Sequence, residues 1–148
     1  MKVFRTTSEI ETVRVAHEIA RSLKGGDVVA LTGELGAGKT TFVRGLARAL
    51  GIRARVTSPT FLLMRCYALP RGKSRRGIRH LCHVDAYRVR GAKELQSVGI
   101  EEYLTSPDTV TLIEWADRVR SILPRRLIHV RFRYGNKIDE RTIVVERD

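Results

Sequence analysis

The sequence is poor in acidic and aromatic residues. No aspartate or glutamate occurs between Glu34 and Asp85, an interval that holds eleven lysines and arginines. Over the whole chain 28 lysines and arginines stand against 16 acidic residues, a formal net charge of +12. Such a charge favours nucleic acid or an acidic protein face as a partner, although a solvated basic surface would give the same composition. Aromatic residues make up only 6% of the chain, and no nucleic-acid motif accompanies the charge, so the sequence does not by itself predict direct RNA binding.

Long apolar runs are also missing. No stretch approaches the length of a membrane span, and the first residues do not lead into the hydrophobic region of a signal peptide. We therefore expect a soluble, cytoplasmic protein without a membrane partner. At 148 residues, the chain is long enough to bury a core as one domain, residues 1–148.

Cysteine is nearly absent. Cys66 and Cys82 are the only two, and each lies in an apolar, strand-like segment, which predicts reduced thiols in the core rather than a disulfide. Cys82 has His80 and His83 as close neighbours in the sequence. Because these residues lack paired C-x-x-C spacing, buried or structural roles are favoured over a zinc site.

One stretch organises the rest of the chain. Residues 33–40 read GELGAGKT and match the phosphate-loop pattern G-x-x-x-x-G-K-[ST] at every fixed position. An apolar run, residues 28–31, precedes this loop and a helical pattern, residues 42–50, follows it, which is the strand–loop–helix context that the motif requires. Lys39 is predicted to reach the β- and γ-phosphates and to act in catalysis, and the Thr40 hydroxyl to hold Mg²⁺. The residues predicted to bind the nucleotide here are Glu34, Leu35, Gly36, Ala37, Gly38, Lys39, Thr40 and Thr41.

The remaining pattern predicts an α/β protein. The expected class is a single P-loop NTPase-like domain with a mixed, mainly parallel sheet, flanked by helices and carrying a C-terminal antiparallel hairpin at its edge. Ser8 with Glu11 forms a capping box for the first helix. The expected strands are 3–5, 28–32, 62–67, 81–84, 109–113, 127–134 and 142–145. The expected helical regions are 10–23, 42–50, 94–104 with a break at Gly99, and 116–123.

A phosphate loop needs a second carboxylate at the end of a neighbouring strand to complete the Mg²⁺ shell. Glu114 follows the apolar run 109–113 and is assigned to the metal, directly or through water. Asp85 follows another strand and is assigned a catalytic part, orienting the attacking water, or a place in the outer metal shell. Surface carboxylates at strand ends are the alternative for both. Thr60, in a Ser-Pro-Thr segment, resembles a switch threonine that senses the γ-phosphate, with a plain turn as the alternative.

A second nucleotide motif is interpreted as accidental. Residues 136–139 read NKID and match the N-K-x-D element by which GTPases recognise guanine. Here the element follows a glycine in the turn of an alternating hairpin, and no D-x-x-G separates it from the phosphate loop. We therefore expect ATP rather than GTP as the ligand.

Taken in order, several motifs resemble one family. The chain contains GELGAGKTTFVRGLARALGI, VTSPTFLL, HVDAYRV, ELQSVGIEEYL and LIEWADR. It resembles the TsaE (YjeE) family of bacterial ATPases over most of its length, from about Ser8 to about Tyr134. The resemblance implies a weak ATPase that acts with the proteins TsaB and TsaD in forming threonylcarbamoyladenosine at adenosine 37 of tRNAs that read codons beginning with A. ATP binding and hydrolysis would then reset TsaD between turnovers.

The resemblance also implies roles for individual residues. The Mg²⁺ ligands of the family fall on Thr40 and Glu114, the aspartate of the H-x-D motif on Asp85, and the tryptophan after the metal ligand on Trp115. Arg141 matches an arginine that reaches the nucleotide from the C-terminal hairpin.

Two other functions remain open from the residues alone. The loop Pro70–Arg79 carries five basic residues, and its part from Arg71 to Arg79 is longer and more positive than expected of the family. This loop could be the lid of a small-molecule kinase, with arginines that clamp phosphates. The acid-free interval could instead belong to a nucleic-acid-binding module gated by ATP. A weak or indirect tRNA contact is compatible with the first function, and no DNA partner is expected.

Overall fold

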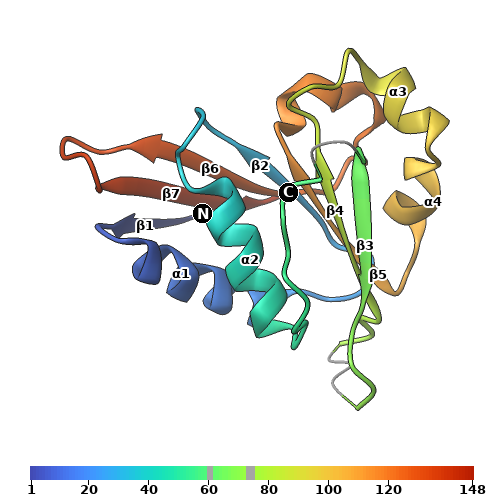
Figure 1. Ribbon diagram of the computed structural model, residues 1–148, viewed down its shortest axis with the longest axis horizontal. Coiled ribbons are helices and arrows are strands. Elements are labelled where there is room, and N and C mark those ends of the chain that lie inside the picture. The colour runs from blue at the N-terminus through green and yellow to red at the C-terminus, as the bar shows by residue number, and fades with distance from the viewer. Residues whose placement is uncertain (60–61, 73–75) are drawn as a thin grey trace.

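A seven-stranded mixed sheet forms the centre of the computed structural model, with the strand order β1-β7-β6-β2-β5-β4-β3 (Figure 1). The structure describes residues 1–59, 62–72 and 76–148. The strands are β1 (Lys2–Thr6), β2 (Val28–Thr32), β3 (Met64–Ala68), β4 (His80–Asp85), β5 (Thr109–Glu114), β6 (Ile128–Tyr134) and β7 (Arg141–Arg147). The helices are α1 (Glu9–Ser22), α2 (Lys39–Ala49), α3 (Ala92–Ser97), α4 (Ile100–Thr105) and the 3-10 helix η1 (Ala116–Ile122). Within the described ranges, no helix has the length and apolar character needed to cross a membrane.

The parallel pairings lie in the middle of the sheet. β2 pairs in parallel with β5 on one side and with β6 on the other, and β5 pairs in parallel with β4. The outer pairings β1–β7, β7–β6 and β4–β3 are antiparallel. The predicted α/β class with a C-terminal hairpin is confirmed. The hairpin is not at the sheet edge, however, because β1 from the N-terminus pairs along its outer strand.

Helices cover both faces of this sheet. One core cluster joins α1 and α2 to the sheet through residues such as Ile19, Phe42 and Leu46, and a second joins α3, α4 and η1 to the other face. All six residues of β5 are buried. A strand covered on both faces needs apolar side chains at successive positions, which explains the unbroken runs in β2 and β5.

The first helix begins as its sequence predicts. The Ser8 hydroxyl accepts a hydrogen bond from the Glu11 backbone N–H at 3.2 Å. The Glu11 carboxylate accepts from the Thr7 backbone N–H at 2.6 Å, one residue before the position that a standard capping box uses. Close packing of α1 on α2 depends on Gly45, since a Cβ there would lie 3.1 Å from the Val13 Cα.

The two cysteines are not free thiols. Cys66 and Cys82 lie directly opposite each other in the antiparallel β3–β4 pair, with Cα atoms 4.1 Å apart, and they form a disulfide. The prediction of reduced core thiols is therefore wrong for this structure. The cause is strand register: each segment reads as an apolar strand, but the sequence does not reveal that the two strands pair with these residues face to face.

The basic loop leads from β3 into the amino end of β4. The Gly25 N–H, just before β2, donates to the Arg76 carbonyl at 3.0 Å, and the Leu69 N–H donates to the Arg79 carbonyl at 2.8 Å. Since β4 and β5 run parallel to β2, these described flanks lie at the edge of the sheet opposite the carboxyl ends of the parallel strands (Figure 1). A lid over residues 33–40 would have to approach from the other edge.

Candidate nucleotide site

The phosphate loop joins the carboxyl end of β2 to the amino end of α2, as its motif predicts. Its glycines are required by the backbone. Gly38, the N-cap of α2, has φ +103°, and Gly33 has φ +143° with the Phe132 carbonyl oxygen 2.6 Å from where a Cβ would stand. Any other residue at Gly33 would collide with β6. The loop is thus held against the sheet while the first N–H groups of α2 remain available for an anion.

Lys39 is the buried cation of this loop. Its side chain donates hydrogen bonds to the carbonyls of Gly33 at 2.6 Å and Glu34 at 2.8 Å. The ammonium also lies 4.0 Å from the centroid of the Trp115 ring. Burial lowers the pKa of Lys39 from its usual value, and nearby carboxylates, Glu114 foremost, oppose that shift. Two backbone carbonyls and the nearby carboxylates thus favour the charged form of Lys39 beside the loop, against the effect of burial.

Thr40 and Glu114 meet across 74 residues of sequence. The Thr40 hydroxyl lies 3.2 and 3.1 Å from the two carboxylate oxygens of Glu114 and donates to them. Glu114 is only 3% exposed, and its Oε1 lies 2.8 Å from Nε2 of the fully buried His83. An ionised Glu114 requires the proton of His83 on Nε2. Nδ1 of the same ring finds no hydrogen-bond partner within the described part of the chain.

Asp85 stands next to Glu114 in the sheet, one strand over. The two residues are register partners at the carboxyl ends of β4 and β5. One Asp85 oxygen accepts from the Ser58 hydroxyl and the other from the Tyr87 backbone N–H at 3.0 Å. Both predicted carboxylates are therefore at the edge of the sheet where the phosphate loop lies, and neither is a loose surface group.

Trp115 has an unusual backbone. Its φ is +59° and its ψ is +40°, the left-handed region, which a non-glycine residue enters only at a cost. The ring lies 4.9 Å from that of Tyr87, centroid to centroid, and the Arg118 guanidinium carbon lies 5.5 Å from it. This conformation turns the chain immediately after Glu114 and brings the indole over Lys39.

The C-terminal hairpin reaches the other side of the loop. The Tyr134 hydroxyl donates to the Leu35 carbonyl, and Arg141 lies over the Tyr134 ring with 4.4 Å from guanidinium carbon to centroid. One Arg141 nitrogen lies 3.5 Å from the Gly36 carbonyl oxygen, at the limit of a hydrogen bond. A small cavity of about 160 Å³ opens here. Its lining residues are Ser8, Glu9, Thr12, Gly36, Gly38, Thr41, Asp139 and Arg141.

Most of the predicted site residues come together. Ala37 is buried, Glu34, Leu35 and Gly36 are exposed at the tip of the loop, and Thr41 lines the small cavity. Thr60 lies outside the described residues. The N-K-x-D turn is exposed, as expected of a hairpin turn, but its Asp139 is beside the loop rather than remote from it.

Sequence reasoning missed two side chains that hold the carboxylates, His83 and Ser58. A usable signal existed for His83. It precedes Asp85 by two residues on one strand, and alternate residues of a strand share a face. Both therefore project on the same side of β4. No comparable signal marks Ser58, whose contact spans 27 residues and a change of direction in the chain.

The donor groups at this edge suit a hard divalent cation. A threonine hydroxyl and one or two carboxylates, combined with phosphate oxygens and water, form the oxygen ligand set that Mg²⁺ prefers. Thr40 and Glu114 present such oxygens within 3.2 Å of each other. The residues present therefore fit a Mg²⁺ ion held together with a polyphosphate.

Fold and loop together place the chain among the P-loop proteins, a nucleotide-binding class. A family model described as "Threonylcarbamoyl adenosine biosynthesis protein TsaE" matches residues 6–143. The chain belongs to the TsaE family, as its motifs predict.

Individual relatives agree with this assignment. The "tRNA threonylcarbamoyladenosine biosynthesis protein TsaE" of Bacillus subtilis is 37% identical over 140 residues, covering 95% of this chain and 82% of the relative. The protein of the same name from Streptomyces coelicolor is 38% identical over 130 residues, covering 85% and 82%. The crystal structure of Bacillus subtilis YdiB superposes with a TM-score of 0.76 at 32% identity, covering 97% of this chain and 83% of that one.

Proposed function

We propose that residues 1–148 form one Mg²⁺-dependent ATPase domain that acts in the cytoplasm with TsaB and TsaD. Together they would form the threonylcarbamoyl group on adenosine 37 of tRNAs that read codons beginning with A. The observation that carries the proposal is the contact between Thr40, on the phosphate loop, and the buried Glu114 carboxylate. That contact joins a phosphate-binding loop to a metal-ligating oxygen, which is the minimum that a P-loop ATPase needs.

Each residue of the site has a role in this proposal. The loop N–H groups and Lys39 bind the phosphates, and Thr40 with Glu114 would hold Mg²⁺, which supplies neutralisation of phosphate charge when bound. Asp85 orients the attacking water or stands in the outer metal shell. His83 and Ser58 keep the two carboxylates in place.

The nucleoside is assigned to the hairpin side of the loop. The small cavity beside Gly36 continues from the loop, and Thr41 and Arg141 line it. Arg141 can contact the nucleotide from the first residue of β7 while its other contacts fix the turn. Adenine is the proposed base, since the N-K-x-D element lies in an exposed turn instead of ending a buried strand.

Slow hydrolysis is expected of the isolated chain. Arg118, whose guanidinium lies 5.5 Å from the Trp115 ring, already donates to the Tyr87 carbonyl. Without a further cation at the developing charge, P-loop proteins hydrolyse slowly. We therefore assign the acceleration to the TsaB–TsaD partner, which makes the chain a switch controlled by that complex.

Two measurements test the proposal. Calorimetric titration with Mg·ATP and with Mg·GTP should give binding for ATP and weaker binding for GTP. Phosphate release should then be slow for the chain alone and faster when TsaB and TsaD are added. Absence of Mg·ATP binding by folded protein, or rapid turnover that ignores the partners, would refute it.

The kinase alternative receives no support from the described residues. Both flanks of the basic loop lie at the sheet edge opposite the phosphate loop. Transfer of labelled γ-phosphate to a metabolite remains the observation that would revive it.

A further inference from the structure

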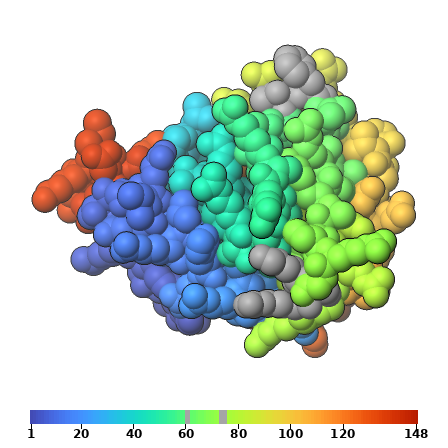
Figure 2. Space-filling view, turned by 60° about the horizontal axis from the view of Figure 1, so that its bottom comes forward, coloured from blue at the N-terminus to red at the C-terminus, as the bar shows by residue number. Residues whose placement is uncertain are grey.

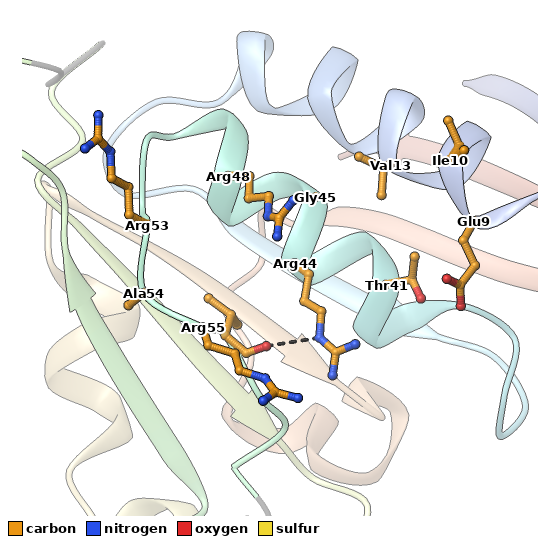
Figure 3. A pocket seen from close by; sticks show the side chains of 11 residues that line it. Glu9, Ile10, Val13, Thr41, Arg44, Gly45, Arg48, Arg53, Ala54 and Arg55 are labelled. Atoms are coloured by element: carbon orange, nitrogen blue, oxygen red, sulfur yellow. Dashed lines mark hydrogen bonds between the residues drawn. The ribbon is translucent and has the colours of Figure 1, made fainter.

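A groove of about 690 Å³ lies over α1, α2 and the segment that follows α2, next to the proposed nucleoside cavity, with which it shares Glu9 and Thr41. Four arginines line it: Arg44 and Arg48 on α2, and Arg53 and Arg55 on the segment that follows. We call this the arginine groove. Figure 2 shows α1 (blue) beside α2 and its following segment (cyan to green) on one face of the molecule. In Figure 3, Arg44 and Arg55 lie close together, Arg48 is one turn further along α2, and Arg53 extends from the far end.

The α1 side of the groove is apolar. Ile10 of α1 is 68% exposed, and Val13, one turn further along, is half-buried. Gly45 of α2 lies against this part of α1, since a Cβ there would stand 3.1 Å from the Val13 Cα, so the groove runs over a close contact between the two helices. The groove therefore has exposed apolar surface on α1 and guanidinium groups on α2 and on the segment that follows it.

The charge of the groove is one-sided. Among the described residues that line it, Glu9 is the only acidic one, and it stands at the end beside Thr41 (Figure 3). Among the described lining residues, no carboxylate stands near the four arginines at the other end. An anionic ligand would therefore be attracted to the part between Arg44 and Arg55 and repelled near Glu9.

We infer that the arginine groove docks an acidic, amphipathic segment of a protein partner, with carboxylates against the guanidinium groups and an apolar side chain over Ile10 and Val13. Arginine suits this task because its planar fork binds carboxylates in pairs. A groove between two helices is a common seat for a segment with one apolar side. RNA phosphates would satisfy the arginines but would leave the apolar side chains of α1 uncovered, so a protein segment is the better match.

Two hydrogen bonds connect the groove to Asp85 in the candidate nucleotide site. Arg44 Nε donates to the Val56 carbonyl at 3.0 Å and so fastens the segment after α2 to the helix that carries Lys39 (Figure 3). Two residues beyond Val56, Ser58 donates to the Asp85 carboxylate. A segment bound at Arg55 would therefore contact the chain next to Val56–Ser58, the stretch that holds Asp85. This part of the inference rests on the proposed function, since it makes docking a means of controlling hydrolysis.

The test uses the full-length chain, the TsaB–TsaD complex and two matched double variants. The groove variant is Arg48→Glu with Arg55→Glu. The control is Arg21→Glu with Arg126→Glu. Each pair joins an arginine from the last turn of a helix to one from a loop, all four are exposed, and both pairs change the net charge equally. Affinity for TsaB–TsaD is measured by calorimetry at low and high salt, and Mg·ATP affinity and thermal unfolding are measured in parallel.

We expect the groove variant to bind the partner complex at least about 10-fold more weakly, a loss of ~1.4 kcal/mol, while the control stays within about twofold. Both should keep Mg·ATP affinity. The salt dependence of partner binding should fall in the groove variant alone. Hydrogen exchange in the wild-type complex should show protection of residues 41–56.

Several results would overturn the inference. Equal weakening in both variants would mean general electrostatic steering. Loss of Mg·ATP affinity in the groove variant would assign the groove to the nucleotide. Loss of binding to purified tRNA with the protein complex intact would assign it to RNA. Unchanged partner affinity in the groove variant would remove the docking surface but leave the proposed function standing. Failure of the wild type to bind TsaB–TsaD would remove both.

Discussion

On one side of the phosphate loop, β4 and β5 supply side chains that are buried and hydrogen-bonded to one another. Glu114 and His83 are 3% and 0% exposed. On the other side, the β6–β7 hairpin supplies Tyr134, which is 44% exposed, and Arg141, which is half-buried. We call these the strand wall and the hairpin wall. The proposed metal-binding part is thus held by strands, and the proposed nucleoside-binding part by more exposed side chains.

This contrast follows from what each wall must do. A carboxylate that holds a metal ion has to keep its orientation, and a buried hydrogen-bond partner such as His83 fixes it. A nucleoside has to enter and leave, and exposed groups at a turn impede it less. Substitutions on the strand wall should therefore reduce Mg·ATP binding or hydrolysis more than substitutions on the hairpin wall do.

The largest effect is expected at Lys39, which lies between the walls. Lys39→Ala removes the buried cation that faces the phosphates, and Mg·ATP affinity should fall about 100-fold or more, ~3 kcal/mol. Calorimetry or the fluorescence of the single tryptophan, Trp115, reports the binding. Retained affinity would show that the loop backbone alone binds the phosphates, and thermal unfolding would confirm that the variant is folded.

The next largest effect separates the two carboxylates of the strand wall. Glu114→Gln should lower Mg²⁺-dependent ATP affinity about 10-fold or more and reduce hydrolysis with it, because it removes the charge of the proposed metal ligand. Asp85→Asn is the matched comparison, with a fall of about 100-fold in turnover and little change in affinity. If Asp85→Asn hydrolysed ATP normally, its assignment as a catalytic group would be wrong.

His83 should act through Glu114 and not on the nucleotide itself. His83→Leu leaves the Glu114 carboxylate without its 2.8 Å partner, and the Mg²⁺ concentration needed for half-maximal nucleotide binding should rise about 10-fold. His83→Gln, which keeps an N–H donor, should restore part of the loss. A merely structural role would lower thermal stability in both variants without shifting the Mg²⁺ requirement.

The strand wall was largely predictable from the sequence. Residues 28–31 and 109–113 read as unbroken apolar runs because the strands are covered on both faces, and residues that follow such runs belong at the carboxyl edge. Lys39 and Thr40 have fixed positions in the loop motif, and Glu114 and Asp85 follow strands. The local sequence pattern was therefore enough to predict that these four residues lie at the same edge of the sheet.

The hairpin wall was harder to predict from the residues. Tyr134 and Leu35 are 99 residues apart, and no local pattern encodes their contact. The same difficulty explains the Cys66–Cys82 disulfide and the place of the hairpin inside the sheet, since both depend on which strands become neighbours. The left-handed conformation of Trp115, the single residue between β5 and η1, also has no signal in the local sequence.

Substitution on the hairpin wall should lower ATP affinity less than the loss of Glu114 does. Arg141→Ala removes a long contact to the Gly36 carbonyl and a partly exposed cation near the nucleoside cavity, so ATP affinity should fall only about threefold, ~0.7 kcal/mol. The same calorimetric titration measures it. An effect as large as that of Glu114→Gln would contradict the distinction between the walls, and an unchanged affinity would remove Arg141 from the nucleotide site.

The smallest expected effect concerns stability and pH, and it tests how far the strand wall acts on Lys39. Burial lowers the pKa of Lys39 in the folded chain below its unfolded value of 10.5, so between those two pKa values the unfolded chain binds more protons. The free energy of unfolding should then rise with pH across that window, and Lys39→Met should abolish the rise.

Glu114 raises the pKa of Lys39, so Glu114→Gln should move the lower end of the window to a lower pH. Urea unfolding at a series of pH values measures all three proteins. A window that does not move in Glu114→Gln would mean that the strand wall fixes the metal ligand without influencing the lysine.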